Sequence, residues 1–450
     1  MTNEEVQDLL DRADEALIAG NYVILERLAS QVLAALALRP DEHSSYCQIY
    51  KSHALRHIGN VARLQGNYSQ ALTLFTNSLS AGESAHDRMC IAFAKNGLGN
   101  VYQSTSEFAL ALECYHDAHS LFEKVGNRER MASTLGNIGN MYLNLSEYSL
   151  AIDYLQQALT IDEELGRTSG IAANLGNIAI LYWNLQEYDQ ALEYMKRALA
   201  LYEQLGYQEG IAVNLGNIGV VYSDRGEYQL ALEYLQKTVA MFETLGRKDG
   251  VAIFLGNIGA AYKHLGQYAS ALENHSRALQ LHQELDNKEG VSITLGNIGL
   301  LYAAREFDGY DNALAEEYLL KALAIDEEIG SKKQVYTHHQ ALAELYRQSK
   351  RWEEFGHHFE NYHRIEKEVL SEDAKKQAYL LEQRRQAAER DKELEIEKAA
   401  AAAKLLATEE LLHNVLPPAI AQRILKGENL IAEKLTNVSV LFADIVEFTK

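Results

Sequence analysis

The chain has 450 residues, 47% of them hydrophobic, which is enough apolar material for a large folded core. Its formal net charge of −21 excludes a general binder of nucleic acids or anionic membranes, since both would be repelled. The three cysteines are widely spaced and give neither a disulfide framework nor a zinc pattern, which indicates a reducing compartment. No apolar run approaches the roughly 18 residues of a membrane span. We therefore expect a cytoplasmic protein.

The strongest pattern in the chain is a repeat of 40 residues. The phrase LGNIG, or the near copy LGNIA, recurs at 135–139, 175–179, 215–219, 255–259 and 295–299, and a tyrosine follows each copy. Weaker copies extend the array in both directions. Because the whole chain contains only three prolines, long uninterrupted helices are expected. We count about nine helix pairs.

One repeat shows how the two helices of a pair are expected to pack. Four residues of its first helix stand at i, i+3, i+4 and i+7 and form a core stripe. They are Leu215, Ile218, Gly219 and Tyr222. In the second helix, Ala231, Leu235 and Thr238 form the facing stripe, with small residues that allow close approach. One pair has too little core of its own, so neighbouring pairs are expected to stack into a superhelix with a concave inner face.

These repeats resemble the 40-residue variety of the tetratricopeptide repeat (TPR), as found in kinesin light chains, Pins-type polarity adaptors and bacterial peptide-sensing regulators. The resemblance covers about residues 1–365 and rests on many copies in one phase. It implies an all-α superhelical solenoid of helix pairs. It also implies a peptide or protein ligand in the concave groove.

A row of asparagines is the candidate binding surface. The asparagine of each LGNIG phrase points nearly opposite the core stripe, and its amide suits the main chain of an extended peptide. The glycine before it leaves room for another backbone. The first row consists of Asn137, Asn177, Asn217, Asn257 and Asn297. The second row, one helical turn further on, consists of Asn144, Asn184, Asp224 and His264.

An alternative reading gives the same asparagines a structural role, in which each bonds to the neighbouring repeat and sets the curvature. Val213, Ile253 and Ile293 add apolar character to the same face. That composition favours a peptide or protein over a small anion. Histidines at 338–339, 357–358 and 363 lack the cysteine or carboxylate spacing of a metal site.

The 40-residue phase ends near Glu366. Residues 366–415 contain no proline or glycine and are rich in Ala, Glu, Lys, Leu and Gln, which predicts one long connecting helix. Its apolar side is imperfect and fits either a single solvated helix or a dimeric coiled coil. We favour the coil, which would make the protein a homodimer. In bacterial signalling proteins headed by TPRs, a similar segment links sensor to output.

Residues 416–450 read as a short amphipathic helix followed by a buried strand that ends at Asp444. The order LPPAIAQRIL, GE and VLFADIVEFT resembles the entry into a class III adenylate/guanylate cyclase domain. The resemblance implies that Asp444 and the Ile445 carbonyl bind two Mg²⁺ or Mn²⁺ ions, which prefer hard oxygen ligands. It also implies that the turn containing Phe448 and Thr449 binds the nucleotide phosphates.

Two departures limit what this segment is expected to do. Glu447 stands where the cyclase family has glycine. The remaining catalytic residues of that family would lie beyond residue 450, so we expect only the N-terminal part of such a domain here. The leading hypothesis is a TPR regulatory region of a signalling adenylate or guanylate cyclase. The alternative is a non-catalytic TPR adaptor with a vestigial C-terminal tail.

Overall fold

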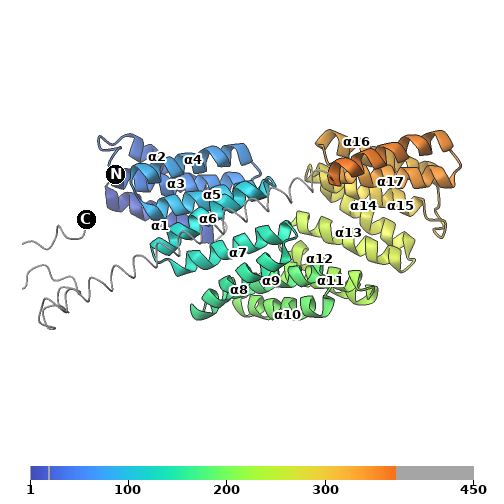
Figure 1. The fold of residues 1–450 in the computed structure, drawn as a ribbon, viewed down its shortest axis with the longest axis horizontal. Helices are drawn as coiled ribbons and strands as arrows, with labels where there is room; N and C mark the ends of the chain where they lie inside the picture. Colours follow the sequence, from blue (N-terminus) through green and yellow to red (C-terminus); the bar gives the residue numbers. More distant parts are fainter. Residues whose placement is uncertain (1, 19–20, 371–450) are drawn as a thin grey trace, which may run out of the picture. The chain divides into compact units, whose positions relative to one another are not determined.

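The computed structural model describes residues 2–18 and 21–370, and all regular structure within them is helical (Figure 1). Residues 1–371 form one compact unit. The described part confirms the expected all-helical solenoid of helix pairs. Most of the connecting segment 366–415 and the whole of 416–450 lie outside the described residues. None of the described helices is long and apolar enough to cross a membrane.

The helices follow one another in pairs, at 40-residue intervals through most of the array. They are α1 (Asn3–Ile18), α2 (Tyr22–Ala37), α3 (Ser45–Leu64), α4 (Tyr68–Ser84), α5 (Arg88–Ser104), α6 (Phe108–Lys124), α7 (Arg128–Asn144), α8 (Tyr148–Glu164), α9 (Thr168–Asn184), α10 (Tyr188–Leu205), α11 (Gln208–Asp224), α12 (Tyr228–Thr244), α13 (Lys248–His264), α14 (Tyr268–Glu284), α15 (Lys288–Tyr302), α16 (Asn312–Ile329) and α17 (Lys332–Gln348). A further helix begins at residue 352 and is described to residue 370.

The odd-numbered and even-numbered helices form two layers within this unit. Each odd helix packs on the even helix that follows it, and each even helix packs on the next odd one. Several odd helices also contact the next odd helix directly, as α3 does with α5 and α11 with α13. Among the described residues, even helices make no comparable contacts with one another. The odd helices therefore lie closer together and form the inner layer of the array.

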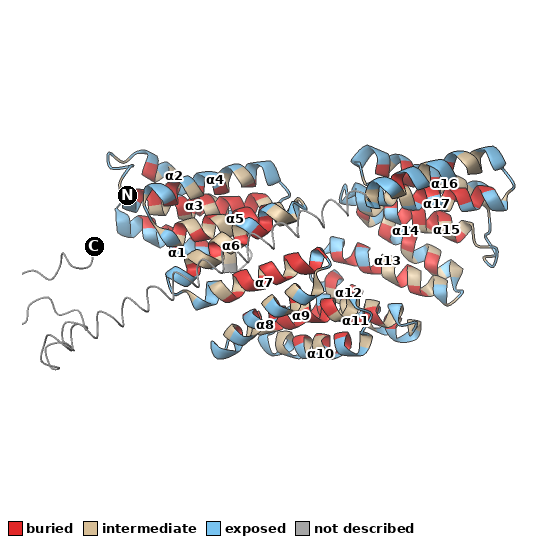
Figure 2. Ribbon diagram, in the orientation of Figure 1, coloured by how far each residue is buried: buried red, intermediate tan, exposed pale blue. Residues whose placement is uncertain are grey.

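The core continues from one repeat into the next, as expected for a unit that cannot bury its own apolar face. Ala231, Leu235 and Thr238 of α12 are fully buried, which confirms the predicted stripe. One cluster joins Ala212 of α11 to Ala278 of α14 through residues of α12 and α13. Figure 2 shows this pattern as buried positions along the facing sides of neighbouring helices.

The turns between helices use left-handed backbone conformations. Glycine supplies them at Gly226 and Gly266, with φ of 87° and 72°. The equivalent turns after α7 and α9 use Ser146 and Gln186 at φ of 59° and 61°. The conformation is therefore set by the turn rather than by the residue, since only glycine adopts it without steric cost.

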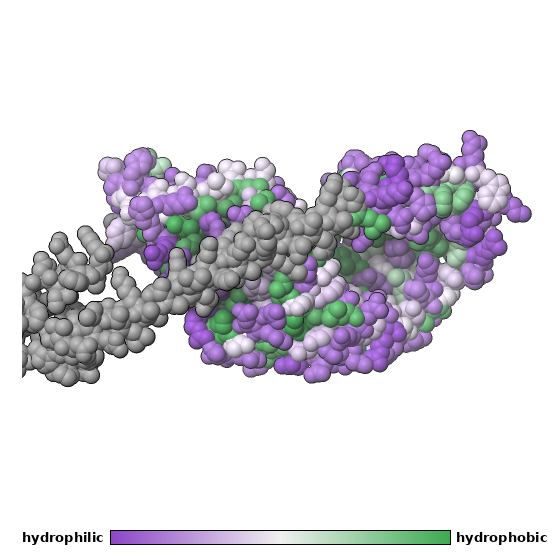
Figure 3. All heavy atoms as spheres, in the orientation of Figure 1, coloured by the Kyte–Doolittle hydropathy of each residue, from purple (hydrophilic) through white to green (hydrophobic). Residues whose placement is uncertain are grey.

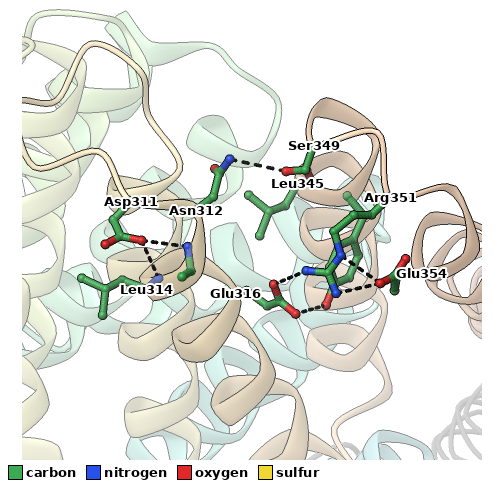
Figure 4. A network of polar contacts seen from close by, with 10 residues as sticks. Asp311, Asn312, Leu314, Glu316, Leu345, Ser349, Arg351 and Glu354 are labelled. Carbon is green, nitrogen blue, oxygen red and sulfur yellow. Dashed lines mark hydrogen bonds and ion pairs between the residues drawn. The ribbon is translucent and has the colours of Figure 1, made fainter.

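An insertion before α16 breaks the strict period, and polar contacts secure the helices that follow it (Figure 4). Asp311 caps α16 by accepting from the backbone N–H groups of Ala313 and Leu314, at 2.8 and 3.1 Å. Glu316 of α16 accepts from Arg351 at 2.6 Å and from the Tyr346 hydroxyl at 2.8 Å. These bonds join α16 to α17 and to the start of the last described helix.

Candidate ligand-binding face of the odd-numbered helices

Three large aliphatic side chains lie exposed at the same position of three successive odd helices. Val213 of α11, Ile253 of α13 and Ile293 of α15 are 40%, 54% and 37% exposed. Each precedes the row asparagine by four residues, so it lies on the same helical face. In the space-filling view most of the visible surface is hydrophilic, with small hydrophobic areas between (Figure 3). Exposed aliphatic side chains aligned on three successive helices are typical of a contact site rather than of scattered exposure.

The first row of asparagines is half-buried in every repeat where it occurs, from α7 to α15. Asn137 donates from Nδ2 to Oδ1 of Asn96 in α5, at 3.4 Å. The side-chain amides of the other four members make no hydrogen bond to another described residue. Their amides therefore keep donors and acceptors for a ligand, whereas Asn137 fits the structural alternative.

The row lies along the seam with the preceding repeat. In α5 the equivalent position is Gly97, and a Cβ there would clash with the ring of Phe75, which is fully buried in α4. The Cβ atoms of the row thus lie next to the preceding even helix, and the side chains extend away from that helix.

The glycines that precede the row have a different role from the expected one at three of the five positions. A Cβ on Gly136 would lie 2.9 Å from Oδ1 of Asn174, in the next odd helix. The space beside Gly216 is occupied in the same way by the side chain of Phe254, and the space beside Gly296 by that of His338. The space is taken by the next repeat rather than by a foreign backbone. At Gly176 and Gly256 nothing lies within 4 Å, so the expected room exists there.

Two members of the second row are exposed amides, and the other two contact residues of a neighbouring repeat. Asn144 and Asn184 are exposed at the ends of α7 and α9. Asp224 accepts a hydrogen bond from Nε1 of Trp183, one repeat earlier, at 2.7 Å. The ring of His264 stacks on Tyr228 with centroids 4.8 Å apart. Asp224 and His264 therefore join neighbouring repeats.

Sequence reasoning missed a cationic group at the N-terminal part of the inner layer. The guanidinium carbons of Arg56 in α3 and Arg130 in α7 lie 4.9 and 5.1 Å from the ring centroid of Phe93 in α5. At such distances a cation is attracted to the ring face. The signal in the sequence is the period, because Phe93 precedes Val213 by three repeats of 40 residues and so occupies the same row.

The C-terminal histidines are engaged with one another and with carboxylates. Nδ1 of His338 lies 2.5 Å from Oδ2 of Asp326, and Nδ1 of His339 lies 2.8 Å from Nδ1 of His358. Burial, with the charge of His358 second, lowers the pKa of His339 to about 4. The described residues contain no group of three or more side chains that is arranged to hold a metal ion. His338, His339 and His358 are buried, and their contacts join neighbouring helices of the last repeats.

The candidate cyclase residues cannot be placed on this face or any other. Asp444, Ile445, Phe448 and Thr449 lie outside the described residues.

The fold and the sequence period together define a helical-repeat protein. The family model described as "Tetratricopeptide repeat" matches residues 90–164, 170–244 and 250–308. The array is therefore a TPR array, as the sequence repeats indicated.

Solved structures share this fold at low sequence identity. A Rap protein complexed with Competence and Sporulation Factor aligns with a TM-score of 0.58 and 19% identity, covering 83% of this chain and all of that one. The apo quorum sensor NprR from Bacillus thuringiensis aligns with a TM-score of 0.57 and 15% identity, covering 80% of this chain and 99% of that one. A signal-transduction ATPase with a TPR sensor from Pyrococcus horikoshii gives 0.55 and 16%, covering 78% of this chain and 54% of that one.

Two curated proteins match a short stretch more closely. The Resact receptor of Arbacia punctulata is 45% identical over 60 residues, and the Speract receptor of Strongylocentrotus purpuratus is 44% identical over 61 residues. These stretches make up 13% and 14% of this chain. The chain spans only 5% of the length of either receptor.

Proposed function

We propose that the TPR array binds an extended peptide, or such a segment of a protein, along its odd-numbered helices. We further propose that binding regulates an adenylate or guanylate cyclase activity. In this proposal the connecting segment 366–415 pairs two copies of the chain and passes the signal to the cyclase domain that begins at residue 416.

The observation that carries the peptide proposal is the composition of the inner face. Exposed aliphatic side chains at Val213, Ile253 and Ile293 alternate with the amides of Asn217, Asn257 and Asn297, which make no hydrogen bond to another described residue. Amides pair with the main chain of a peptide, and the aliphatic row accepts its apolar side chains. The similar structures of a Rap protein complexed with Competence and Sporulation Factor and of a quorum sensor support a receptor role.

Substitution of Ile253 tests the peptide proposal. Pooled random dodecapeptides are expected to bind the wild-type chain, and Ile253→Asp is expected to weaken binding about tenfold or more, because burial of an apolar side chain is lost and a charge is desolvated. Equilibrium dialysis with mass spectrometry of the retained peptides measures this.

The matched control for Ile253 is Leu230→Asp. Leu230 is a similarly exposed aliphatic residue, at 38%, but it belongs to the even helix α12. Binding to this variant should equal that of the wild type. Equal losses in both variants would contradict a site on the odd helices, and the absence of any retained peptide would contradict the peptide proposal itself.

The cyclase proposal rests on the resemblance of residues 411–450 and needs a test of its own. The protein expressed from its native gene is expected to form cyclic AMP or cyclic GMP with Mg²⁺ or Mn²⁺. Asp444→Ala is expected to abolish this activity, because the carboxylate is the proposed metal ligand. Absence of cyclic nucleotide from the wild type, with the peptide still bound, would favour the adaptor alternative.

A further inference from the structure

The last described helix, from residue 352 to residue 370, exposes a row of large apolar side chains. Trp352, Phe359 and Leu370 are 63%, 43% and 62% exposed. They are separated by 7 and 11 residues, which places them within about 20° of one line along an α-helix. Gly356 lies beside this line, and the space that its Cβ would occupy is open. We call these four residues the end face.

Contacts among aromatic rings hold this row on the folded part of the last repeat. The ring of Phe359 stacks on that of Phe355 with centroids 5.2 Å apart, and the ring of Trp352 meets Phe355 edge-on at 6.1 Å. Phe355 in turn packs against the buried cluster that contains Leu342 of α17 and Ile365 of the last helix. The end face is therefore part of the folded array, and its aromatic composition is typical of a protein–protein interface.

The place of Phe359 in the repeat is buried in every earlier pair. Phe359 is the eighth residue of its helix, which follows α17 and so has the even place in the last pair. In every even helix from α2 to α16 the eighth residue is at most 1% exposed. Phe75 of α4 shows the cause, because its ring lies against Gly59 of the preceding odd helix and Gly97 of the next one. Within the described residues no odd helix follows the last one, so one side of Phe359 is uncovered.

The residues that follow directly are not expected to cover the end face. Elsewhere a short turn with a left-handed residue leads into the next odd helix, as at Gly246 between α12 and α13. Residues 371–415 lie outside the described residues, and their sequence has no glycine or proline, which predicts a helix that runs on without turning back. Leu381, 11 residues beyond Leu370, continues the apolar line in that sequence. A second copy of the chain carries the same line and can supply the cover.

We propose that the end face packs on the end face of a second copy of the chain, about a two-fold axis. This inference rests on the proposed pairing of two copies through segment 366–415 and extends that pairing into the TPR array itself. A two-fold contact uses the same patch on both copies, which an apolar line allows without opposing like charges. The last helix of one copy then occupies, on the other, the place that the next odd helix has in the earlier pairs. Both Phe359 rings are thereby buried, and Gly356 lets the two helices approach closely.

Trp352 reports contact at the end face directly, because the chain has only one other tryptophan, Trp183. In the full chain with Trp183→Phe, acrylamide quenching of the remaining tryptophan should fall as the protein concentration rises and the dimer forms. Sedimentation velocity over the same concentrations measures the dimer. A dimer whose Trp352 stays equally accessible to acrylamide would overturn the inference, while pairing through segment 366–415 stands.

Substitution of Phe359 tests the same contact by its strength. Phe359→Glu should raise the dissociation constant of the dimer about tenfold or more, since apolar burial is lost and a charge enters the contact. Phe359→Leu keeps an apolar side chain and should dimerise like the wild type, and urea unfolding checks that both variants are folded.

The matched control is Leu230→Glu, which places the same charge on a similarly exposed residue of α12, at 38%. Its dimer should be as strong as that of the wild type. Equal dissociation constants for the wild type and Phe359→Glu would overturn the inference alone. A wild type that stays monomeric at every concentration would overturn both the inference and the proposed pairing.

Discussion

Arg167→Met is expected to destabilise the array by about 3–5 kcal/mol, because it leaves a buried carboxylate without its counter-charge. Asp162, near the end of α8, is fully buried. Its Oδ1 accepts from Nε of Arg167 at 2.7 Å, and its Oδ2 accepts from Nδ2 of Asn174 at 2.9 Å. Arg167 also donates from Nη1 to Oγ of Ser133 in α7, at 3.1 Å. The arginine thus joins three successive helices.

The loss should appear as a lower urea midpoint and as faster amide hydrogen exchange in α8 and α9. The control is Arg225→Met, whose partner Asp189 is 87% exposed and whose own side chain is 39% exposed. An exposed pair contributes about 0–1 kcal/mol. Adding Asp162→Asn to Arg167→Met should recover most of the loss, since it removes the unpaired charge. A similar small effect for Arg167→Met and Arg225→Met would contradict a role for the buried pair.

Gly97→Asn is expected to cost about 3 kcal/mol, at the upper end of the range for overpacking a core. A side chain at this position meets the ring of Phe75, which also lies against Gly59 of α3. By the 40-residue period, Leu155 and Asn177 occupy the places that correspond to Phe75 and Gly97. In the repeat between them, Asn137 is combined with Tyr115, so an aromatic ring at this place does not by itself exclude the asparagine, and the test concerns the particular contact of Phe75 with residue 97.

The double variant Phe75→Leu/Gly97→Asn should therefore be more stable than the Gly97→Asn chain. Phe75→Leu alone should cost about 1–2 kcal/mol through the space that it leaves. The double-mutant cycle, measured by chemical unfolding, should give a coupling of about 1–3 kcal/mol in favour of the pair. Additive losses would show that the ring of Phe75 and a side chain at residue 97 do not compete for the same space.

The sequence predicted the helix pairs and their core well, because both depend on spacing along the chain. The positions of Ile218, Gly219, Ala231, Leu235 and Thr238 as buried residues follow directly from helical periodicity. The TPR array was recognisable for the same reason, since each copy of the phrase repeats the same local pattern.

The candidate site was predicted only in part. The exposed aliphatic row and the half-buried asparagines lie on the inner layer, as expected. The filled space at Gly136, Gly216 and Gly296 was not expected, because the side chains that fill it come from the next repeat. The Arg56–Phe93–Arg130 group was missed, because each member is 37 residues from the next in sequence. The three residues come together only when the repeats stack.

The sequence by itself determined the kind of architecture, since a 40-residue period of apolar residues specifies two short amphipathic helices that must stack to bury their faces. Only the tertiary structure decided which polar groups are satisfied and which remain for a ligand. The side chain of Asn137 bonds to that of Asn96 across a repeat boundary, whereas the side chains of Asn217 and Asn257 form no hydrogen bond with another described residue. The physical reason is that a hydrogen bond depends on the side chain one repeat away, and that neighbour changes although the local pattern does not.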